Sequence, residues 1–359
     1  MKIEAAILRS AHDPFVIEDV TLREPDQGEI LVRLAGVGMC HTDLFARHGM
    51  GALPLIAGHE GSGVVEAVGS AVEGVAVGDH VVLAFDSCGL CSRCLDARPA
   101  LCASFVEKNF VGNQSSVLDG DGNVVTAGWF GQSSFATFAL ASPRNAVVVD
   151  KALPLELLGP LGCGVITGAG SVLVGTEVGA GSSVAVFGAG SVGLSVVMAA
   201  RVAGATTIIA VDLHESRLAL ATEVGATHTI IGGEDVAAQI KTVTGREGID
   251  FSYETTGVPA VVADAVASLC SGGVCGLIGI PVGPSVLDTS VIMAGRTVVG
   301  LIEGLSNPQT LIPKLLELWQ QGRFPFDKLI RTFALSEINE AERLASSGEV
   351  VKPVLVPGG

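Results

Sequence analysis

The cysteines are the residues of this sequence most able to do chemistry. Four of the eight lie between positions 88 and 102, in the pattern C-x2-C-x2-C-x7-C. Two-residue spacings let neighbouring thiolates face one ion, and four sulfur ligands complete a tetrahedral zinc site with no open position. An iron–sulfur cluster is the alternative, but a ferredoxin motif continues x3-C-P, whereas the last gap here is seven residues. The sequence therefore predicts a closed, structural zinc site formed by the clustered cysteines: Cys88, Cys91, Cys94 and Cys102.

A second metal site can be built from residues outside this cluster. Cys40 and Cys163 stand apart from it, near glycines or polar turns. A catalytic zinc takes three protein ligands and keeps a fourth position open, and two cysteines with one histidine are a documented ligand set. His59, in the stretch AGHEGSGVV, is the candidate histidine. The other pair, Cys270 and Cys275, lies in an apolar run and is expected in the core.

A glycine pattern typical of dinucleotide-binding proteins lies in the second half of the chain. VAVFGAGSVG places Gly188, Gly190 and Gly193 as G-x-G-x-x-G between a predicted strand and a predicted helix. A second strand follows and ends at Asp212, whose carboxylate would accept hydrogen bonds from the adenosine ribose and repel a 2′-phosphate. The sequence therefore predicts NAD rather than NADP. Arg217, also assigned to the cofactor site, keeps NADP open as the alternative.

Two patterns of predicted secondary structure along the chain indicate which elements position these residues. Residues 1–150 hold many short β-type runs separated by glycine turns, which favours a partly open β-barrel or sandwich. From about residue 165, strands alternate with Ala-rich helical stretches, which predicts βαβ units and a parallel sheet. A helical pattern, TLIPKLLELWQQG, follows residue 303, and the final VVKPVLV is predicted to be a strand that returns to the first domain.

Composition limits the class of protein and its partners. The chain has 359 residues, of which 48% are hydrophobic and 16% charged, so a disordered chain is excluded. A formal net charge of −16 disfavours nucleic acid and anionic membranes as partners. The N-terminus lacks the pattern of a secretory signal, so we expect a cytoplasmic protein with reduced thiols.

Several of these motifs together resemble a known family. GMCHTD, GHEGSGVV, the four-cysteine loop, LGCGVITG and VFGAGSVG, in this order, are similar to the zinc-dependent medium-chain alcohol dehydrogenases over essentially the whole chain. ELLGPLGCGVITGAG, GQSSFATFAL and QQGRFPFDKLI most resemble the aryl-alcohol (benzyl-alcohol) dehydrogenases. The resemblance implies an α/β fold: a mainly β, GroES-like catalytic domain (1–164, resumed at 303–359) with an inserted Rossmann-type, doubly wound parallel sheet (165–302). It also implies NAD, two zinc ions per subunit, and a homodimer or homotetramer.

The resemblance assigns roles to individual residues. Around the metal it implies Cys40, His59 and Cys163 as zinc ligands, Glu60 as a carboxylate that binds the metal transiently, Asp43 as the hydrogen-bond partner of the zinc-bound imidazole, and Thr42 as proton acceptor from the alcohol. Toward the cofactor it implies His41 and Lys352 at the pyrophosphate and Thr167 and Val192 at the nicotinamide, with Ile280 in a neighbouring loop.

One position departs from the family pattern. Many members carry a histidine three residues after the position of Thr42, which passes the proton to solvent, and here Phe45 stands there. An apolar ring cannot relay a proton, so the route ends at Thr42 and the ribose, uses water, or employs another residue such as His48.

The expected function is the reversible oxidation of primary aromatic or allylic alcohols to aldehydes, with substrate contacts from loops around Phe85, Phe110, Ile280 and Glu303. The alternatives are oxidation of an S-(hydroxymethyl)thiol, which is a formaldehyde adduct, or of a polyol. A redox-inert NAD-binding scaffold or sensor is the non-enzymatic alternative.

Overall fold

The computed structural model describes residues 1–358, without the side chains of residues 113–115. The chain forms two compact units. The first comprises Met1–Cys163, Asn307–Pro313 and Asp327–Gly359, and the second comprises Gly164–Ser306 and Lys314–Phe326. The sequence places all of residues 303–359 with the first domain, whereas the structure groups residues 303–306 and 314–326, which include the second half of helix α9 (Pro308–Gln320), with the second unit.

Two β-sheets build the first unit. Five strands close into a barrel: β1 (Lys2–Leu8), β2 (Val16–Leu22), β7 (Asn113–Leu118), β8 (Val124–Ala127) and β4 (Leu55–Ile56). A seven-stranded sheet has the order β10 (Ala146–Val149), β6 (His80–Leu83), β5 (Glu60–Val68), β3 (Ile30–Gly38), β18 (Lys352–Val356) and β17 (Ile330–Ala334), with β9 (Phe138–Ala141) also paired with β3. The predicted β-rich first half is thus confirmed.

The C-terminal strand returns to the first unit, as the sequence predicts. Strand β18 pairs antiparallel with β3, with Val354 opposite Gly38, and parallel with β17. The helices α1 (His41–Leu44), α2 (Ser92–Leu95) and α10 (Ile338–Ser346) also belong to this unit. Because β3 and β5 are neighbours and α1 begins just after β3, the segments that carry the candidate metal ligands meet at one end of this sheet.

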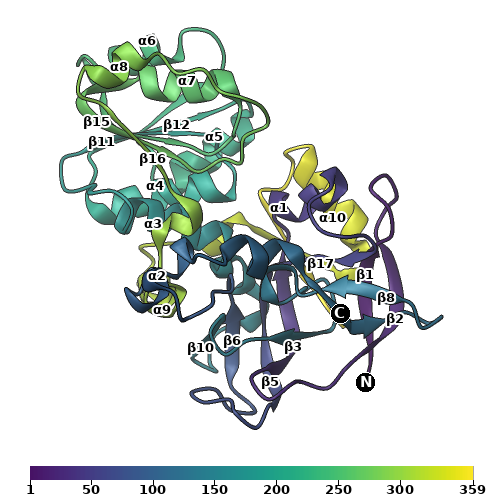
Figure 1. Ribbon diagram of the computed structural model, residues 1–359. Coiled ribbons are helices and arrows are strands. Elements are labelled where there is room, and N and C mark those ends of the chain that lie inside the picture. The colour runs from purple at the N-terminus through teal and green to yellow at the C-terminus, as the bar shows by residue number, and fades with distance from the viewer. Residues whose placement is uncertain (359) are drawn as a thin grey trace. The chain divides into compact units, whose positions relative to one another are not determined.

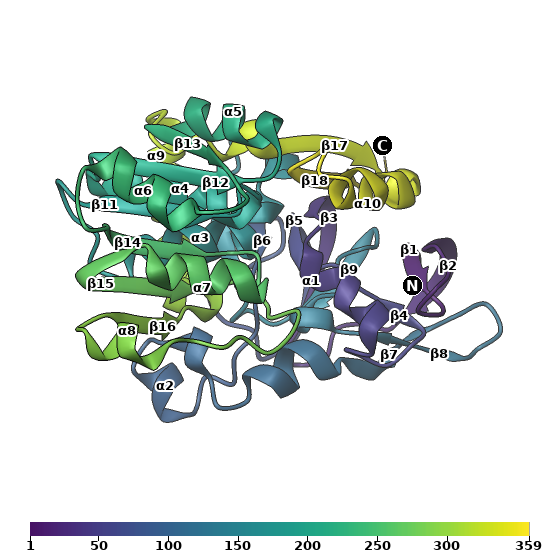
Figure 2. The same cartoon turned by 90° about the horizontal axis from the view of Figure 1, so that it is seen from above.

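A six-stranded parallel sheet is the centre of the second unit. Its order is β13 (His228–Ile231), β12 (Thr207–Asp212), β11 (Ser183–Phe187), β14 (Ile249–Glu254), β15 (Leu269–Leu277) and β16 (Thr297–Gly300), and the strands lie side by side in this order in Figure 2. The unit includes the helices α3 (Gly164–Leu173), α4 (Ser191–Ala203), α5 (Glu215–Val224), α6 (Val236–Thr244), α7 (Pro259–Ala267) and α8 (Thr289–Met293), together with the second half of α9. Figure 1 shows α6 and α7 on one face of the sheet and α3 and α4 on the other. The predicted doubly wound βαβ arrangement is confirmed.

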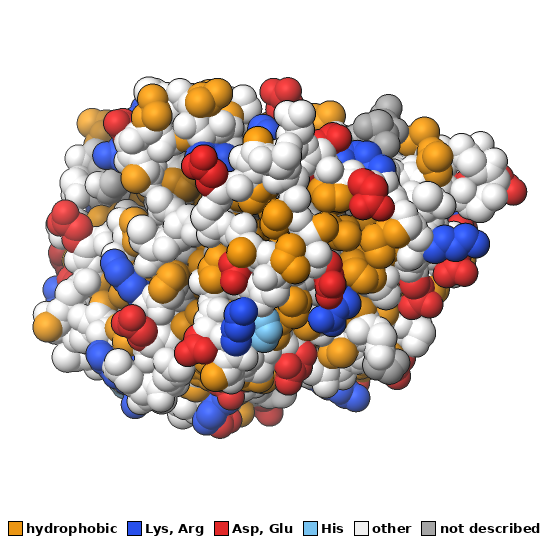
Figure 3. Space-filling model, turned by 90° about the horizontal axis from the view of Figure 1, so that it is seen from below, with side chains coloured by type: hydrophobic (Ala, Val, Ile, Leu, Met, Phe, Trp, Pro, Cys, Tyr) orange, Lys and Arg blue, Asp and Glu red, His pale blue; other side chains and the backbone are white. Residues whose placement is uncertain are grey.

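The central strands of this sheet are apolar on both faces because helices cover both. All five residues of β11 are buried, and Ile209, Ile249 and Phe187 pack into one core cluster with Ala265 of α7. No helix within residues 1–358 is long and apolar enough to cross a membrane. On the face drawn in Figure 3, lysine and arginine side chains are scattered among acidic ones.

Candidate active site

Four side chains that could bind a metal converge in the first unit. Cys40 directly precedes α1, and Cys163 is the last residue of the first unit's N-terminal segment. His59 directly precedes β5, and Glu60 is the first residue of that strand. The antiparallel register places Gly38 of β3 opposite Glu60 of β5. One ligand atom from each of the four residues lies within 4.8 Å of the others. The structure therefore brings together the residues predicted as the catalytic zinc ligands.

The hydrogen bonds of His59 leave one ring nitrogen ready for a metal. The side chain is completely buried, and Nδ1 lies 2.7 Å from Oδ1 of Asp43. When Nδ1 carries the proton, it donates a hydrogen bond to this carboxylate, and Nε2 keeps a lone pair that can bind a metal. Nε2 is buried and has no hydrogen-bond partner among the described residues. A buried imidazole held in this way fits a zinc ligand oriented by a carboxylate behind it.

Asp43 also fixes the backbone beside two of the ligands. Its Oδ1 accepts a hydrogen bond from the Gly58 N–H at 2.9 Å, and its Oδ2 accepts one from the Cys40 N–H at 3.1 Å. One buried carboxylate therefore holds the His59 ring and the segments that carry both ligands. Asp43 has the position predicted for it.

The charges of the site favour a metal-binding thiolate. A hydrogen bond with Cys163 lowers the pKa of Cys40 well below its usual value, against the effect of burial, and His59 lowers it further. Burial alone would lower the pKa of His59, but the Asp43 charge and hydrogen bond outweigh burial and raise it. Because metal binding requires thiolate and neutral imidazole, an ion in this site would compete with protons for both side chains.

Glu60 forms a buried ion pair with Lys352. The ammonium group donates to both Glu60 carboxylate oxygens at 2.9 Å and to the Met39 carbonyl at 3.1 Å, and Lys352 is 2% exposed. Burial raises the pKa of Glu60, and the Lys352 charge partly opposes this rise. A Cβ atom at Gly38 would lie 1.9 Å from Glu60 Oε2, so only glycine leaves room for the pair. Contact of Lys352 with pyrophosphate stays a prediction.

The residues predicted to handle the proton lie around α1. The Thr42 hydroxyl oxygen is 3.6 Å from the Cys40 sulfur, and its side chain is half-buried. Phe45 is half-buried, with its ring edge-on to His41 at 5.4 Å and to His48 at 6.3 Å between centroids. Both histidines are exposed. The apolar ring of Phe45 thus lies between two exposed imidazoles.

An aromatic cluster packs against His59, the candidate zinc ligand. Its central residue, Phe130, was not predicted as a site residue from the sequence. The Phe130 ring stacks on the His59 ring, with 4.3 Å between centroids and 22° between planes. Phe110 lies edge-on to both Phe130 and Trp129, at 5.0 and 5.5 Å. Phe130 has φ of 52°, a left-handed conformation that a bulky side chain rarely adopts. In the sequence, the only signal was two adjacent aromatic residues between glycines in GWFG.

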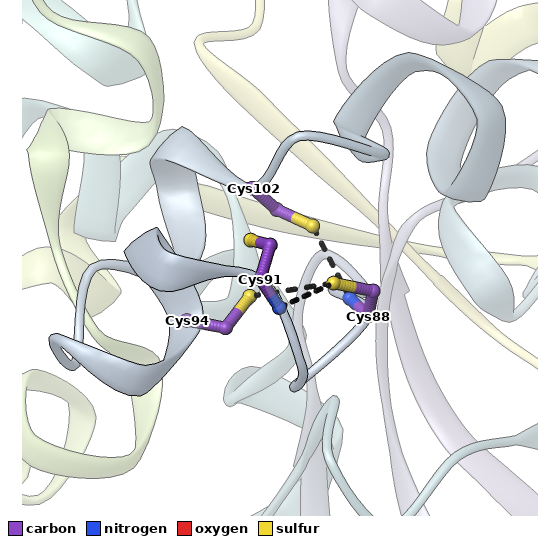
Figure 4. A group of neighbouring side chains, drawn as sticks. All are labelled: Cys88, Cys91, Cys94 and Cys102. Carbon is purple, nitrogen blue, oxygen red and sulfur yellow. Dashed lines mark hydrogen bonds between the residues drawn. The ribbon is translucent and has the colours of Figure 1, made fainter.

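The four clustered cysteines also come together. Figure 4 shows their sulfur atoms turned toward one another, and all four lie within 4.8 Å of one another. The Cys88 and Cys94 sulfurs are 3.9 Å apart. Backbone N–H groups of Ala103 and then Cys94 lower the pKa of Cys91 to about 6. The four donors fit the closed tetrahedral zinc site predicted from their spacing.

The second unit contains the glycine turn predicted for a dinucleotide. Gly188 has φ of 96°, and a Cβ at Gly193 would lie 1.8 Å from the Gly188 carbonyl oxygen. A Cβ at Gly190 would meet no atom within 4 Å, so space is open in front of the turn. Helix α4 begins directly after Gly190, and the buried Ser191 hydroxyl has no partner among the described residues. Backbone N–H groups at a helix start and a free hydroxyl fit a pyrophosphate.

A cavity of about 420 Å³ lies beside Asp212 at the end of β12. The Asp212 carboxylate accepts hydrogen bonds from the backbone N–H groups of Ala189 (2.7 Å) and His214 (2.9 Å), which ties it to the glycine turn. Arg217 also lines the cavity, and its guanidinium lies 3.9 Å from the carboxylate. The structure thus places Asp212 and Arg217, both predicted for the cofactor site, at one cavity.

The other predicted cofactor residues lie on the same unit. Val192 is half-buried in the first turn of α4, and Ile280 is 39% exposed after β15. Thr167 of α3 is buried and donates a hydrogen bond to Glu303 at 3.1 Å. The roles of these residues toward a cofactor stay predictions.

Comparisons with known proteins cover both units. The family described as "Alcohol dehydrogenase GroES-like domain" matches residues 26–151, and the one described as "Zinc-binding dehydrogenase" matches residues 191–321. Geraniol dehydrogenase of Castellaniella defragrans is 44% identical over 365 aligned positions, which cover 98% of this chain and 97% of that protein. The chain belongs to the zinc-dependent medium-chain alcohol dehydrogenase family.

Solved structures of alcohol dehydrogenases agree with this fold. Benzyl alcohol dehydrogenase of Acinetobacter calcoaceticus has a TM-score of 0.94 and 41% identity, with both chains fully covered. An alcohol dehydrogenase zinc-binding domain protein of Burkholderia ambifaria has a TM-score of 0.96 and 48% identity over 99% of each chain. The predicted family and fold class are confirmed. As an alcohol dehydrogenase, the chain is an enzyme for small-molecule alcohols, and its family generally uses zinc and a nicotinamide dinucleotide.

Proposed function

We propose that this alcohol dehydrogenase catalyses the reversible, NAD-dependent oxidation of primary aromatic or allylic alcohols to aldehydes. Cys40, His59 and Cys163 would hold the catalytic zinc, and the four-cysteine loop a structural one. The single observation that carries the substrate class is the Phe130 ring stacked on the His59 imidazole. A substrate bound to a metal at His59 Nε2 would therefore lie close to an aromatic ring.

The aromatic cluster favours conjugated substrates over polar ones. From Phe130 the cluster continues through Phe110 to Phe105 and Phe85, with neighbouring centroids 5.0–6.3 Å apart. An aryl ring or an allylic double bond can pack edge-on or offset against such rings. A polyol would lose hydrogen bonds to water for its remaining hydroxyl groups. The names of the two relatives, geraniol dehydrogenase and benzyl alcohol dehydrogenase, agree with this substrate class.

The chain's own residues have separate tasks in the reaction. Zinc supplies Lewis-acid chemistry when bound, because it lowers the pKa of a hydroxyl on it. Asp43 keeps the His59 ring in the orientation and tautomer that a ligand needs. Phe130 excludes water from one side of the imidazole, and the Thr42 hydroxyl, 3.6 Å from the Cys40 sulfur, accepts the alcohol proton. A nicotinamide dinucleotide held at the glycine turn and Asp212 would supply the hydride acceptor that oxidation of an alcohol to an aldehyde requires.

NAD is the proposed cofactor because Asp212 lies at the adenosine cavity, where a carboxylate repels a 2′-phosphate. We propose a homodimer or homotetramer as the working form. Oxidation of an S-(hydroxymethyl)thiol or a polyol is the second candidate for the reaction.

A substrate series tests the proposed function. NADH formation is measured with benzyl alcohol, an allylic terpene alcohol, ethanol, sorbitol and S-(hydroxymethyl)glutathione. We expect kcat/KM to be highest for the first two substrates. Higher kcat/KM for ethanol, sorbitol or the thiol adduct would overturn the proposal.

A pair of variants tests whether the aromatic cluster sets this preference. Phe110→Leu removes edge-on contacts worth about 0.5–1.5 kcal/mol, so kcat/KM for benzyl alcohol should fall by up to about tenfold relative to ethanol. Phe333→Leu, at a buried phenylalanine on β17, is the matched control and should leave the ratio between the two substrates unchanged. Equal ratios in both variants would contradict the role of the cluster.

A further inference from the structure

A strained turn follows the last strand of the parallel sheet. Glu303 (φ 48°, ψ 30°), Gly304 (φ 60°) and Leu305 (φ 51°) are three consecutive residues in the left-handed region, beginning three residues after β16 ends at Gly300. Only glycine adopts this conformation without strain, so the backbone is strained at Glu303 and Leu305. Strain of this kind persists where the surroundings enforce it, and it is concentrated at functional sites.

Close packing against α3 enforces the turn. A Cβ at Gly304 would lie 2.7 Å from both the Thr167 carbonyl oxygen and the Ser171 nitrogen, so the two backbones are in contact. The Ser306 N–H and hydroxyl both donate to the Glu303 carbonyl, at 3.1 and 2.7 Å. The result is a buried Glu303 carboxylate that accepts the Thr167 hydroxyl hydrogen bond at 3.1 Å. The geometry fixes the position of one acidic side chain.

The sheet order indicates what this carboxylate faces. Ligands of an open parallel sheet bind beyond the carboxyl ends of its strands, at the point where the strand order reverses, and a dinucleotide places one half on each side of that point. Here the reversal lies between β11 and β14, and the adenosine cavity at Asp212 lies on the β12 side. The turn that carries Glu303 follows the carboxyl end of β16, on the other side. This side belongs to the nicotinamide half.

We propose that the Glu303 carboxylate faces the nicotinamide ring and favours the oxidised cofactor over the reduced one. This inference rests on the proposed NAD-dependent function and adds a residue that sets the relative affinity for NAD⁺ and NADH. The oxidised ring carries a positive charge and the reduced ring is neutral, so a carboxylate beside it attracts only the oxidised form. Two opposite unit charges within about 10 Å, at an effective dielectric constant of about 20, change an equilibrium by about tenfold or more.

Direct binding measurements on the purified full-length protein test the proposal. The dissociation constants of NAD⁺ and NADH are measured by calorimetry and by NADH fluorescence in the wild type and in Glu303→Gln. The amide keeps the shape and the hydrogen bond from Thr167 but removes the charge. We expect the ratio Kd(NAD⁺)/Kd(NADH) to rise about tenfold, as the Coulomb energy above requires. A change of less than about twofold, well below that expectation, would overturn the assignment.

A second pair of variants separates charge from folding. Aspartate and asparagine both tolerate a left-handed conformation, and they differ from each other in charge. Glu303→Asn should therefore show a higher ratio than Glu303→Asp, and equal ratios would contradict the proposal. Asp264→Asn, at the adenosine cavity, is the control, and it should change both dissociation constants by the same factor. If the wild type bound neither form, the proposed NAD-dependent function would fail as well, whereas tight binding with unchanged ratios would refute only the role of Glu303.

Discussion

Replacement of Lys352 by methionine is the sharpest test of how the first unit holds its buried charges. The Lys352 ammonium lies 2.9 Å from both Glu60 carboxylate oxygens, and the side chains are 3% and 0% exposed. Two unit charges at this separation attract each other by about 6 kcal/mol at an effective dielectric constant of about 20. Methionine fills similar volume, so the main loss is this attraction, which leaves Glu60 as a buried carboxylate without its cation. Removing one partner of a buried pair costs about 3–5 kcal/mol.

The same two strands supply a matched control. Arg33 on β3 and Glu66 on β5 form an ion pair at 2.6 Å, but their side chains are 50% and 40% exposed. An exposed pair contributes about 0–1 kcal/mol, so Arg33→Met should cost far less than Lys352→Met. The double variant Lys352→Met/Glu60→Gln should regain most of the loss, because it removes the uncompensated charge.

Urea unfolding followed by tryptophan fluorescence measures these differences. The chain has two tryptophans, Trp129 in the first unit and Trp319 in the second, so a Trp319→Phe background makes the signal report the first unit alone. The zinc content of each variant is measured alongside. The reasoning would be refuted if Lys352→Met lowered the free energy of unfolding by less than about 1 kcal/mol, or by no more than Arg33→Met does. Either result would mean that the buried ion pair contributes no more to stability than an exposed one.

Three further predictions concern the metals, acid stability and the proton route. Cys163→Ala should bind one zinc per chain and stay folded, whereas Cys102→Ser should lose the other zinc and melt at lower temperature; elemental analysis and thermal melting check both. Burial would raise the pKa of Asp250, but hydrogen bonds from Ser183 outweigh it and hold that pKa low. Stability from this carboxylate is therefore present at neutral pH and lost as the pH falls below about 3.9, so Ser183→Ala should cost stability at neutral pH and little in acid, as urea unfolding at both pH values would show. Phe45→His should shift the pH dependence of turnover, because it places a titratable ring between two exposed histidines, and an unchanged profile would contradict a part for Phe45 in proton release.

Local patterns carried most of what the sequence could predict. The glycine fingerprint depends on residues within one turn, and the structure shows why two of its three glycines are needed: Gly188 has positive φ and Gly193 has no room for a Cβ. The four-cysteine loop is similarly local, since all its sulfurs come from fifteen consecutive residues. Alternation of strands and helices sufficed for the parallel sheet, because each βαβ unit is contiguous in the chain.

Contacts between distant segments could not be predicted in this way. The final strand was expected to return to the first unit, but its register was not, and the register sets Val354 opposite Gly38 and brings Lys352 to Glu60. The Thr167–Glu303 hydrogen bond spans 136 positions and depends on two backbones touching. Tertiary packing determines which of these distant residues come into contact, and the hydrophobic periodicity of the sequence contains no information about it.

The placement of the buried acids shows how the two units divide the chemistry. In the first unit, Asp43 serves the imidazole of His59 and Glu60 serves the ammonium of Lys352, so both carboxylates near the candidate metal have a positive or proton-donating partner in the same unit. The glycine turn and Asp212 belong wholly to the second unit. Each unit therefore assembles its own ligand site from its own residues. The folding of either site needs no ligand atom from the other, so substitutions in the aromatic cluster should change substrate preference and leave the dinucleotide site intact.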